Sequence, residues 1–517
     1  MRNKLLWNIV FIVVFLLMLA GEALAILALF HLNMLPKVYL MALAGVFAFF
    51  SLIIGLLLFI RGRRPGKTRQ IIACVLALLV FLGTAAITTV ANDVMKTIKA
   101  TSQSEDGMAV RVVYVLEDNP VRTLKGTAGY TYGYLKNYDE SCTQQALEEL
   151  TRQTNDQIMT AGYTTPAQMI RALLEERIDA VVLNGGYFSI LEETEEFVDI
   201  SRHVRILSWV EVDPSIPWEG SETTEILEET QPTEPVETQP EEPEVDYTSL
   251  EPFIVYVSGS DSYDSEIVMN SRSDVNILAV VNPMTKQILL VNTPRDYYIH
   301  SAYSGKLDKL THCGIYGTGC SMKTLGNLYD AKIDYYVRIN FTGFKKLIDA
   351  LGGVTVYSDY AFTAITRTKI AKGENHLTGQ QALDFARERY TLKGGDNERG
   401  KHQMQVITAV IEKATDGNTI ISNYSDIMAS VEGMFSMDVP VELIGNLMKM
   451  QLSDMASWNV VSYSATGSGS MEECYSLPGM ELSVLKPNQS SVSKAIRLID
   501  MVCEGEFLTE EVVNSIL

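Results

Sequence analysis

Three long apolar segments open the chain. Residues 5–32 carry a single acidic side chain, Glu22, residues 39–60 carry no charge over 22 positions, and residues 71–90 carry none over 20. As helices, all three are long enough to cross a hydrocarbon core of about 30 Å. A cleaved signal peptide does not fit the first segment, because its apolar run is too long and a second run follows at once. The sequence therefore predicts three transmembrane helices within residues 1–92.

The short connections between these segments indicate the orientation of the chain. The first connection offers only His31 and Lys37, whereas the second is crowded with basic residues, namely Arg61, Arg63, Arg64, Lys67 and Arg69. Positively charged loops stay in the cytoplasm, and Arg2 and Lys4 place the N-terminus there too. Three crossings then leave a short tail and one loop inside and all later residues outside. Glu22 would lie near the outer interface, where we expect it to snorkel or face the bundle; a functional intramembrane carboxylate is the alternative.

After the apolar segments the pattern changes to short alternating elements. Residues 110–116, 180–183 and 204–210 are strand-like, and residues 144–154 and 166–175 have helical periodicity. Thr164 and Thr165 followed by Pro166 are typical of a helix start. We expect an extracytoplasmic α/β accessory domain over residues 105–212, and nothing in it looks catalytic.

Charge is distributed unevenly along the chain. The 42 Lys and Arg residues face 63 Asp and Glu, a net charge of -21, which argues against a nucleic-acid partner because phosphate requires a basic face. Residues 211–246 alone hold 13 acidic side chains and no Lys or Arg, among repeated Pro, Thr and Gln. Such a segment cannot bury a core, so residues 213–248 are predicted to be an acidic, disordered linker.

Alternating apolar elements resume over residues 250–517. Residues 253–257, 276–281, 287–291, 331–341 and 354–357 read as strands, and residues 344–351 as a helix that Gly352 and Gly353 end. This order predicts an α/β or α+β domain with a central mixed sheet flanked by helices.

The candidate chemistry of this domain rests on Asp and Arg residues at element ends, because the G-x-S-x-G and H-E-x-x-H signatures are missing. Asp261 and Asp274 lie close to the ends of neighbouring strands and can share a hard cation such as Mg²⁺, although loop aspartates are more often turn formers. Arg295 follows a strand directly after Pro294, either as a fixed cation or as half of a surface pair with Asp296.

Two further clusters supply more cations. Thr378 and Gln381 form a capping box that starts a helix, and an extended exit after it would turn Arg387 and Arg389 to the same side as a two-pronged clamp for phosphate. A second helix opens at Asp396, with Arg399 and Gln403 one and two turns along, which suits an anion. Together, these clusters in a membrane-tethered domain indicate a lipid-linked phosphate as ligand.

The same segments resemble the LytR-CpsA-Psr family, in its capsule-type branch. The likeness covers residues 252–415 in order and spacing and continues in the tail, and it is carried by residues 258–261, 272–274, 294–296, 309–312, 333–343, 351–354, 387–390, 396–403, 475–479 and 485–487. Three N-terminal helices before an accessory domain agree with that branch. His402 departs from the family pattern before the Gln; we expect it to face solvent, with titration near neutral pH as the alternative.

The resemblance implies a membrane-anchored phosphotransferase of the Gram-positive type of cell envelope. Such an enzyme would move a glycopolymer, whether capsule, teichoic acid or another wall polysaccharide, from undecaprenyl pyrophosphate to N-acetylmuramic acid of peptidoglycan through a phosphodiester. In the family pattern, Mg²⁺ would be held by Asp261 and Asp274, with Mn²⁺ as a possible substitute. The residues implied to bind pyrophosphate are Arg272, Arg295, Arg387, Arg389, Arg399 and Gln403, and those implied in catalysis are Arg295, Arg387, Arg389 and Asp396.

Two other functions stay open at this point, and neither involves nucleic acid. A hydrolase would release the polymer without joining it, and a non-enzymatic regulator would bind the lipid-linked saccharide and signal inward. In an oxidising compartment, Cys313 is also predicted to pair with Cys320, and Cys474 with Cys503, with free buried thiols as the alternative.

Overall fold

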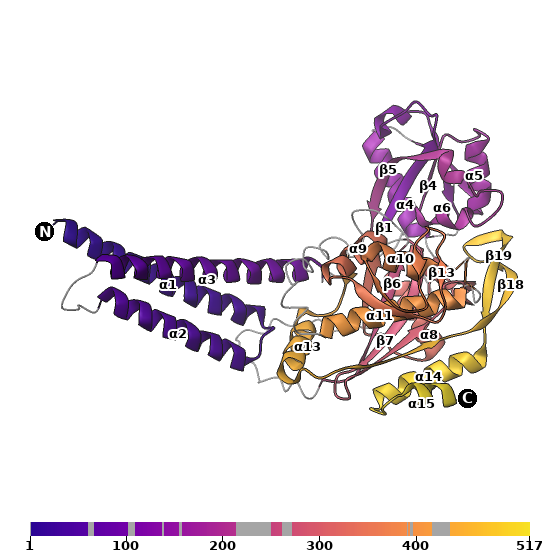
Figure 1. Cartoon of the computed structure of the whole chain (residues 1–517). Helices are drawn as coiled ribbons and strands as arrows, with labels where there is room; N and C mark the ends of the chain where they lie inside the picture. The colour runs from indigo at the N-terminus through magenta and orange to yellow at the C-terminus, as the bar shows by residue number, and fades with distance from the viewer. Residues whose placement is uncertain are drawn as a thin grey trace, which may run out of the picture.

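Three parts make up the molecule: a helical bundle, the accessory domain and a C-terminal domain (Figure 1). The structure is a computed structural model, and it describes residues 2–59, 67–101, 109–136, 139–154, 158–213, 250–260, 271–389, 391–392, 396–415 and 435–516. The predicted linker, apart from Asp213, lies outside these residues. Below, the accessory domain denotes residues 109–213 and the C-terminal domain residues 250–516.

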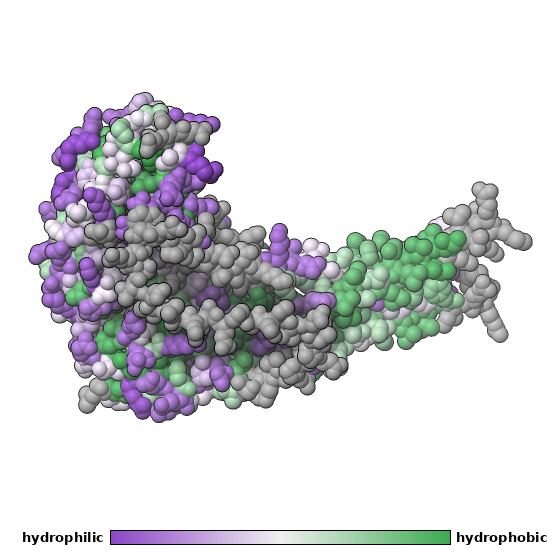
Figure 2. Space-filling view, turned by 180° about the vertical axis from the view of Figure 1, so that it is seen from behind, coloured by the Kyte–Doolittle hydropathy of each residue, from purple (hydrophilic) through white to green (hydrophobic). Residues whose placement is uncertain are grey.

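The helical bundle consists of α1 (Arg2–Leu32), α2 (Lys37–Phe59) and α3 (Lys67–Thr101). All three contain a segment long and apolar enough to cross a membrane, as predicted. Their outer surface forms a hydrophobic column, in contrast to the polar surface of the other parts (Figure 2). Glu22 faces the bundle interior, where its carboxylate accepts hydrogen bonds from Ser51 Oγ at 2.7 and 2.9 Å. This partner explains why an acidic side chain is tolerated there.

The accessory domain is built on a five-stranded sheet with the order β3-β2-β4-β1-β5. Its elements are β1 (Ala109–Leu116), η1 (Leu124–Thr127), β2 (Thr131–Leu135), α4 (Glu140–Thr154), β3 (Met159–Tyr163), α5 (Pro166–Leu174), β4 (Ala180–Leu183), α6 (Gly186–Leu191), η2 (Ile200–Arg202) and β5 (Val204–Val212). Thr165 caps α5 by accepting from Gln168 N at 3.2 Å, as the sequence predicts. Sequence analysis did not predict β2 and β3, which are short and contain Thr and Gly.

A six-stranded sheet with the order β16-β11-β6-β7-β8-β17 forms the centre of the C-terminal domain. Its strands are β6 (Phe253–Ser260), β7 (Ser273–Asn282), β8 (Gln287–Asn292), β11 (Tyr335–Asn340), β16 (Phe435–Met437) and β17 (Asn459–Ser464). β6 pairs with β11 in parallel and with β7 antiparallel, so the predicted mixed sheet is confirmed.

Helices cover both faces of this sheet. On one face, α8 (Thr318–Tyr329) and α14 (Gln489–Cys503) bury a core that includes Leu278 and Leu498, and on the other α11 (Asp396–Thr415) packs through Met404 and Ile407. The α/β class expected from alternating elements follows from this three-layer arrangement. Next to α11 lie α9 (Phe341–Ala350) and α10 (Gly379–Arg387).

Shorter elements complete the C-terminal domain. They are β9 (Tyr298–His300), β10 (Leu307–Lys309), α7 (Leu310–Cys313), η4 (Gly314–Tyr316), β12 (Val354–Ser358), β13 (Phe362–Thr363), β14 (Lys369–Ile370), β15 (Gly373–Leu377), α13 (Val441–Asp454), β18 (Gly467–Cys474), β19 (Leu477–Pro487) and α15 (Glu510–Ser515). Gly352 and Gly353 follow α9 with φ of +75° and +86°, which is the left-handed backbone that glycine favours and that ends the helix. The predicted strand at residues 354–357 exists as β12, but it pairs with β15 outside the central sheet.

One helix of the C-terminal domain rests on the bundle (Figure 1). Lys449 of α13 donates from Nζ to Asn33 Oδ1 at 2.5 Å, and Tyr39 OH donates to Leu452 O at 3.1 Å. Met34 packs among apolar side chains of the same helix. The connection between α1 and α2 therefore lies against the C-terminal domain.

The six cysteines are all free thiols, so both predicted disulfides are wrong. Cys313 instead donates from its thiol to Ser301 Oγ at 3.5 Å. Cys474 is buried in the core shared with the accessory domain, while Cys503 ends α14 with its side chain exposed.

Candidate functional site

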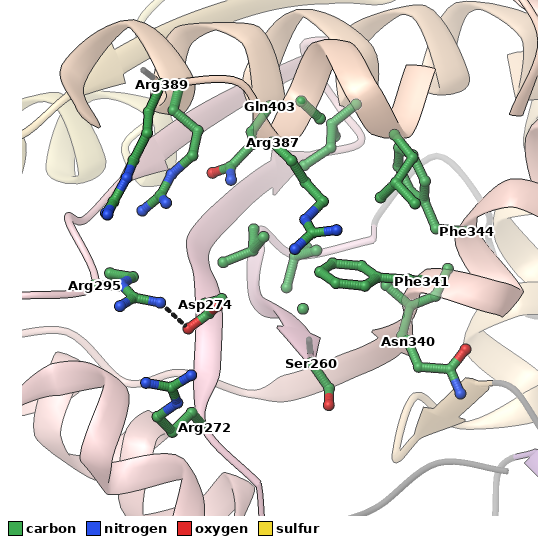
Figure 3. Close-up of a pocket in the computed structure, with 18 residues that line it drawn as sticks. Ser260, Arg272, Asp274, Arg295, Asn340, Phe341, Phe344, Arg387, Arg389 and Gln403 are labelled. Carbon is green, nitrogen blue, oxygen red and sulfur yellow. Dashed lines mark hydrogen bonds and ion pairs between the residues drawn. The ribbon is translucent and has the colours of Figure 1, made fainter. Parts of the chain in front are cut away.

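A pocket of about 320 Å³ lies between the central sheet and the three helices α9, α10 and α11 (Figure 3). One part of its wall is apolar and is lined by Val257, Val275, Ile339, Phe341, Phe344, Leu383, Ala386 and Ile407. The other part is polar and strongly cationic, and it is lined by Gly259, Ser260, Arg272, Asp274, Arg295, Asn340, Arg387, Arg389, Arg399 and Gln403. One cavity thus offers an apolar surface and five guanidinium groups.

Asp274 is the acidic group of the cationic wall. It lies inside β7, not before the strand as the sequence suggests, and Arg295 Nη1 donates to its Oδ1 at 2.6 Å. Thr311 Oγ1 donates to the same oxygen at 3.3 Å. Burial raises the pKa of Asp274, but the charges of Arg295, Arg272 and Arg399 outweigh burial and hold that pKa below its usual range. Asp274 is therefore a carboxylate at neutral pH.

A buried arginine that sequence analysis missed fixes the strand ends below this wall. Arg338 of β11 is fully buried and donates from Nη2 to Ser271 O at 2.7 Å and from Nη1 to Ser258 Oγ and Ser273 Oγ at 3.0 and 3.1 Å. These bonds tie β11 to the segment that carries Arg272. In the sequence, Arg338 is a single charged residue in an otherwise strand-like run. A charged residue on the exposed face of a strand gives the same pattern, so the sequence does not show that Arg338 is buried.

The two arginines of the predicted clamp both line the pocket. The capping box of Thr378 and Gln381 starts α10 as predicted, and α10 ends at Arg387 with Glu388 extended at φ -64° and ψ 133°. Arg387 places its guanidinium 4.2 Å from the centroid of the Phe341 ring. The extended exit therefore turns Arg387 and Arg389 toward the same cavity (Figure 3).

Glu388 holds this exit from behind. Its buried carboxylate accepts hydrogen bonds from Ile365 N at 2.6 Å, from Arg389 N at 2.9 Å and from Thr391 N at 3.0 Å. Three backbone donors on one carboxylate fix the chain on both sides of Arg389. The arginines are presented by a rigid turn.

The helix α11 contributes Arg399 and Gln403 to the pocket, as predicted. It begins at Asp396, whose side chain lies outside the described part of the structure. The expectation that His402 faces solvent is wrong, because its ring is 4% exposed and stacks on Phe385 with ring centroids 3.9 Å apart. Burial lowers the pKa of His402 and so favours a neutral, structural imidazole.

Of the two predicted metal ligands, the structure describes only Asp274. Asp261 lies outside the described residues, while Asp274 presents an ionised carboxylate in the pocket wall, which suits one ligand of a hard cation. A separate trio, Asp308, His312 and Cys474, brings its possible ligand atoms within 4.8 Å of one another. Because Asp308 Oδ1 already bonds His312 Nδ1 at 2.7 Å and Ser476 Oγ at 3.0 Å, we interpret this trio as a buried polar network.

Sequence analysis also missed one acidic residue beside the cationic wall. Glu193 belongs to the accessory domain, and its carboxylate pairs with Arg272. No local pattern in the sequence marks it, because its partners are far away along the chain.

Comparisons with known proteins identify the family of the chain. A model described as the LytR_cpsA_psr family matches residues 218–492, more than half of the chain. The chain is 36% identical over 197 residues to the polyisoprenyl-teichoic acid--peptidoglycan teichoic acid transferase TagU of Enterococcus faecalis, covering 38% of this chain and 64% of that protein. It is 36% identical over 190 residues to the Bacillus cereus protein of the same name, covering 37% and 61%. Both matches span less than two thirds of the relative.

Solved structures give similar matches over half of the chain. The crystal structure of B. subtilis TagU is 26% identical, covers 50% of this chain and 100% of that chain, and has a TM-score of 0.39. That of B. subtilis TagV is 23% identical, covers 50% and 99%, and has a TM-score of 0.41.

Proposed function

Because the chain belongs to the LytR-CpsA-Psr family, we propose that it is a membrane-anchored phosphotransferase that joins a polyisoprenyl-linked glycopolymer to peptidoglycan. The donor is a glycopolymer on undecaprenyl pyrophosphate, and the acceptor is the C6 hydroxyl of N-acetylmuramic acid. The observation that carries the proposal is the single pocket with one apolar and one cationic wall. A polyprenyl pyrophosphate has these same two parts, a hydrocarbon chain and a compact multiple anion.

The apolar wall suits the lipid. Phe341 and Phe344 of α9 and Ile407 of α11 line it, and together with β-branched residues of the sheet they offer a surface without charge. Burial of hydrocarbon there gains about 25 cal/mol per Å² of apolar surface removed from water. The first isoprene units adjacent to the pyrophosphate are the part that a pocket of this size can cover.

The cationic wall suits the pyrophosphate and the reaction. The acceptor hydroxyl attacks the sugar-bearing phosphorus and releases its proton to solvent. A new P–O bond replaces the P–O–P bridge, and polyprenyl phosphate leaves with the bridging oxygen. Negative charge grows on that leaving group. Guanidinium groups at fixed positions, such as Arg295, Arg387 and Arg389, stabilise such charge, and phosphoryl transfer depends on positioning and electrostatics more than on covalent catalysis.

A divalent cation belongs to the proposal as well. Asp274 is the described ligand candidate, and Asp261 is the predicted residue that would complete the site. Bound Mg²⁺ would supply further neutralisation of the pyrophosphate charge. Arg295 is also paired with Asp274 at 2.6 Å, so the carboxylate lies beside one cation of the wall.

The proposed topology places the site outside the cell. The basic second connection favours the cytoplasm, and the first connection lies against α13 of the C-terminal domain. Three crossings put this connection and the C-terminal domain on one side of the membrane, so the contact between Asn33 and Lys449 supports the proposal.

The test is a transfer assay with the full chain in detergent. The protein receives a polyprenyl-pyrophosphate-linked saccharide and a muramic-acid-containing peptidoglycan fragment, and mass spectrometry scores the joined product and free polyprenyl phosphate. We expect both products in equal amounts. Polyprenyl phosphate without a joined product would contradict transfer and identify a hydrolase, and binding without any product would identify a regulator.

A further inference from the structure

The accessory domain sends one carboxylate into the edge of the cationic wall. Glu193 lies in the turn after α6, and its side chain is 14% exposed. Its Oε1 accepts from Arg272 Nη1 at 2.7 Å, and its Oε2 accepts from Lys309 Nζ at 2.5 Å. Arg295 Nη2 is 3.9 Å from Oε1. One residue of the accessory domain therefore contacts a pocket-lining arginine of the C-terminal domain.

This carboxylate is locked in its ionised form. His312 is completely buried, bonds Asp308 Oδ1 through Nδ1 at 2.7 Å, and places Nε2 3.8 Å from Glu193 Oε1. Burial raises the pKa of Glu193, but the charges of His312 and Lys309 and the hydrogen bond from Lys309 outweigh burial and hold that pKa well below its usual range. Glu193 is thus a permanent anion between fixed cations.

The turn that carries Glu193 is anchored to the C-terminal domain. Asn184 Nδ2 donates to Ile315 O at 2.6 Å, and the hydroxyls of Tyr187 and Tyr316 are 2.9 Å apart. Gly186 packs so closely on Ile315 that any side chain there would collide with it. Apolar residues of both domains form one continuous core around these contacts. The position of Glu193 is therefore set by an interface and not by a loose loop.

We propose that Glu193 is a positioning residue for the phosphate site, so that the accessory domain completes the site. The role rests on the proposed function. Arg272 has five N–H donors, and a bond from one of them to a fixed carboxylate sets the plane of the whole guanidinium toward the pocket. The carboxylate also offsets repulsion among closely spaced cations before the substrate anion arrives.

The opposite role is an anion that competes with pyrophosphate for Arg272 and Lys309. Two features favour positioning over competition. Arg272 lines the pocket whereas Glu193 does not, so the carboxylate holds the arginine from outside the cavity. Lys309 is almost fully buried and does not line the cavity either, which makes it a partner of Glu193 and not a group withheld from the substrate.

The experiment compares Glu193→Gln, Glu193→Asp and a control in the full chain in detergent. The control is Glu196→Gln, three residues after Glu193. It removes the exposed ion pair between Glu196 and Arg171, which lies away from the pocket. The measurements are the Kd for inorganic pyrophosphate by calorimetry, KM and kcat for transfer, and Tm. We expect Glu193→Gln to raise Kd and KM about tenfold while Tm stays within a few degrees. Glu193→Asp keeps the charge with a shorter reach and should lose less, and Glu196→Gln should match the wild type.

Several results would overturn the role. Unchanged Kd and KM in a folded Glu193→Gln variant, with or without a lower Tm, would show that Glu193 forms a structural ion pair and has no positioning role. Tighter pyrophosphate binding in that variant would identify a competing anion. If Glu193→Gln does not fold, a normal Kd in Glu193→Asp decides against positioning. Wild-type protein that binds pyrophosphate but forms no joined product would contradict the transferase, while the Kd comparison still decides the role of Glu193.

Discussion

Arg387 is the residue whose loss should reveal the phosphate clamp. Its guanidinium stacks on Phe341, and the rigid turn at Glu388 aims it into the pocket. Truncation to Ala removes charge-assisted hydrogen bonds to pyrophosphate worth about 1.5–3 kcal/mol. The cation–π contact with Phe341 is present in the free protein as well, so its loss lowers stability by about 0.5–1 kcal/mol and does not add to the loss in kcat/KM. The loss of about 1.5–3 kcal/mol in bonds to pyrophosphate corresponds to a fall of roughly 10- to 150-fold in kcat/KM.

Arg387→Lys should lose nearly as much as Arg387→Ala. A lysine keeps the charge but has no planar fork to meet two phosphate oxygens and stacks less well on Phe341. The assay is the transfer reaction of the full chain in detergent, with Tm measured in parallel. Arg497→Ala is the matched control, because Arg497 lies on α14 across the sheet and its ion pairs with Glu504 and Glu506, at 4.0 and 3.6 Å, are exposed.

Near-normal transfer by a folded Arg387→Ala, Arg389→Ala double variant would refute the clamp. A loss of activity accompanied by a large fall in Tm would attribute the effect to folding, and the Arg497→Ala control shows how far Tm can move through loss of a surface charge alone.

Three further predictions concern the metal, pH and the core. Chelator should abolish transfer and Mg²⁺ or Mn²⁺ should restore it, while Asp274→Asn should lower kcat more than lipid binding; full activity in chelator would exclude the metal. Burial lowers the pKa of His312, but Asp308 and Glu193 outweigh burial and raise that pKa above 6.5, so its charge stabilises the fold fully below pH 6.5 and less as pH rises through the folded pKa. The difference in Tm between wild type and His312→Gln should therefore shrink from pH 5.5 to 8.5, and growth would contradict this sign. Leu498→Ala, at a fully buried position of α14, should cost about 2–5 kcal/mol and lower Tm without changing KM, and an unchanged Tm would contradict its place in the core.

Local signals in the sequence predicted the parts of the site that are built locally. Thr378 and Gln381 lie three positions apart, so a capping box can be read directly, and the chain direction after Arg387 follows from where that helix ends. Gly352 and Gly353 similarly predict where α9 ends. The long uncharged runs of the three membrane segments are also a property of neighbouring residues, and they predicted all three helices.

Contacts between distant segments were not predictable in this way. Glu193 and Arg272 are separated by the acidic linker, and neither residue carries a mark of the other. His402 was misjudged because a polar residue on a helix face is exposed or buried according to the elements that cover it, here the Phe385 ring of α10. The predicted pair of Cys474 and Cys503 failed for the same reason, since an oxidising compartment permits a bond but does not bring two distant sulfur atoms together. The thiols of Cys313 and Cys320 do lie within hydrogen-bonding reach of each other, although they are not bonded as a disulfide.

In the proposed topology, the contact of α13 with the first connection sets the height of the pocket above the bilayer. Lys449 and Leu452 hold α13 to the ends of two spans, and the strand before that helix, β16, pairs with β11, which ends at the pocket in Asn340. This chain of contacts is short and continuous, so the reactive groups stand at a constant level. Under the proposed function, a carrier lipid that diffuses laterally in the membrane would meet these groups in two dimensions, so its lateral diffusion would govern the encounter.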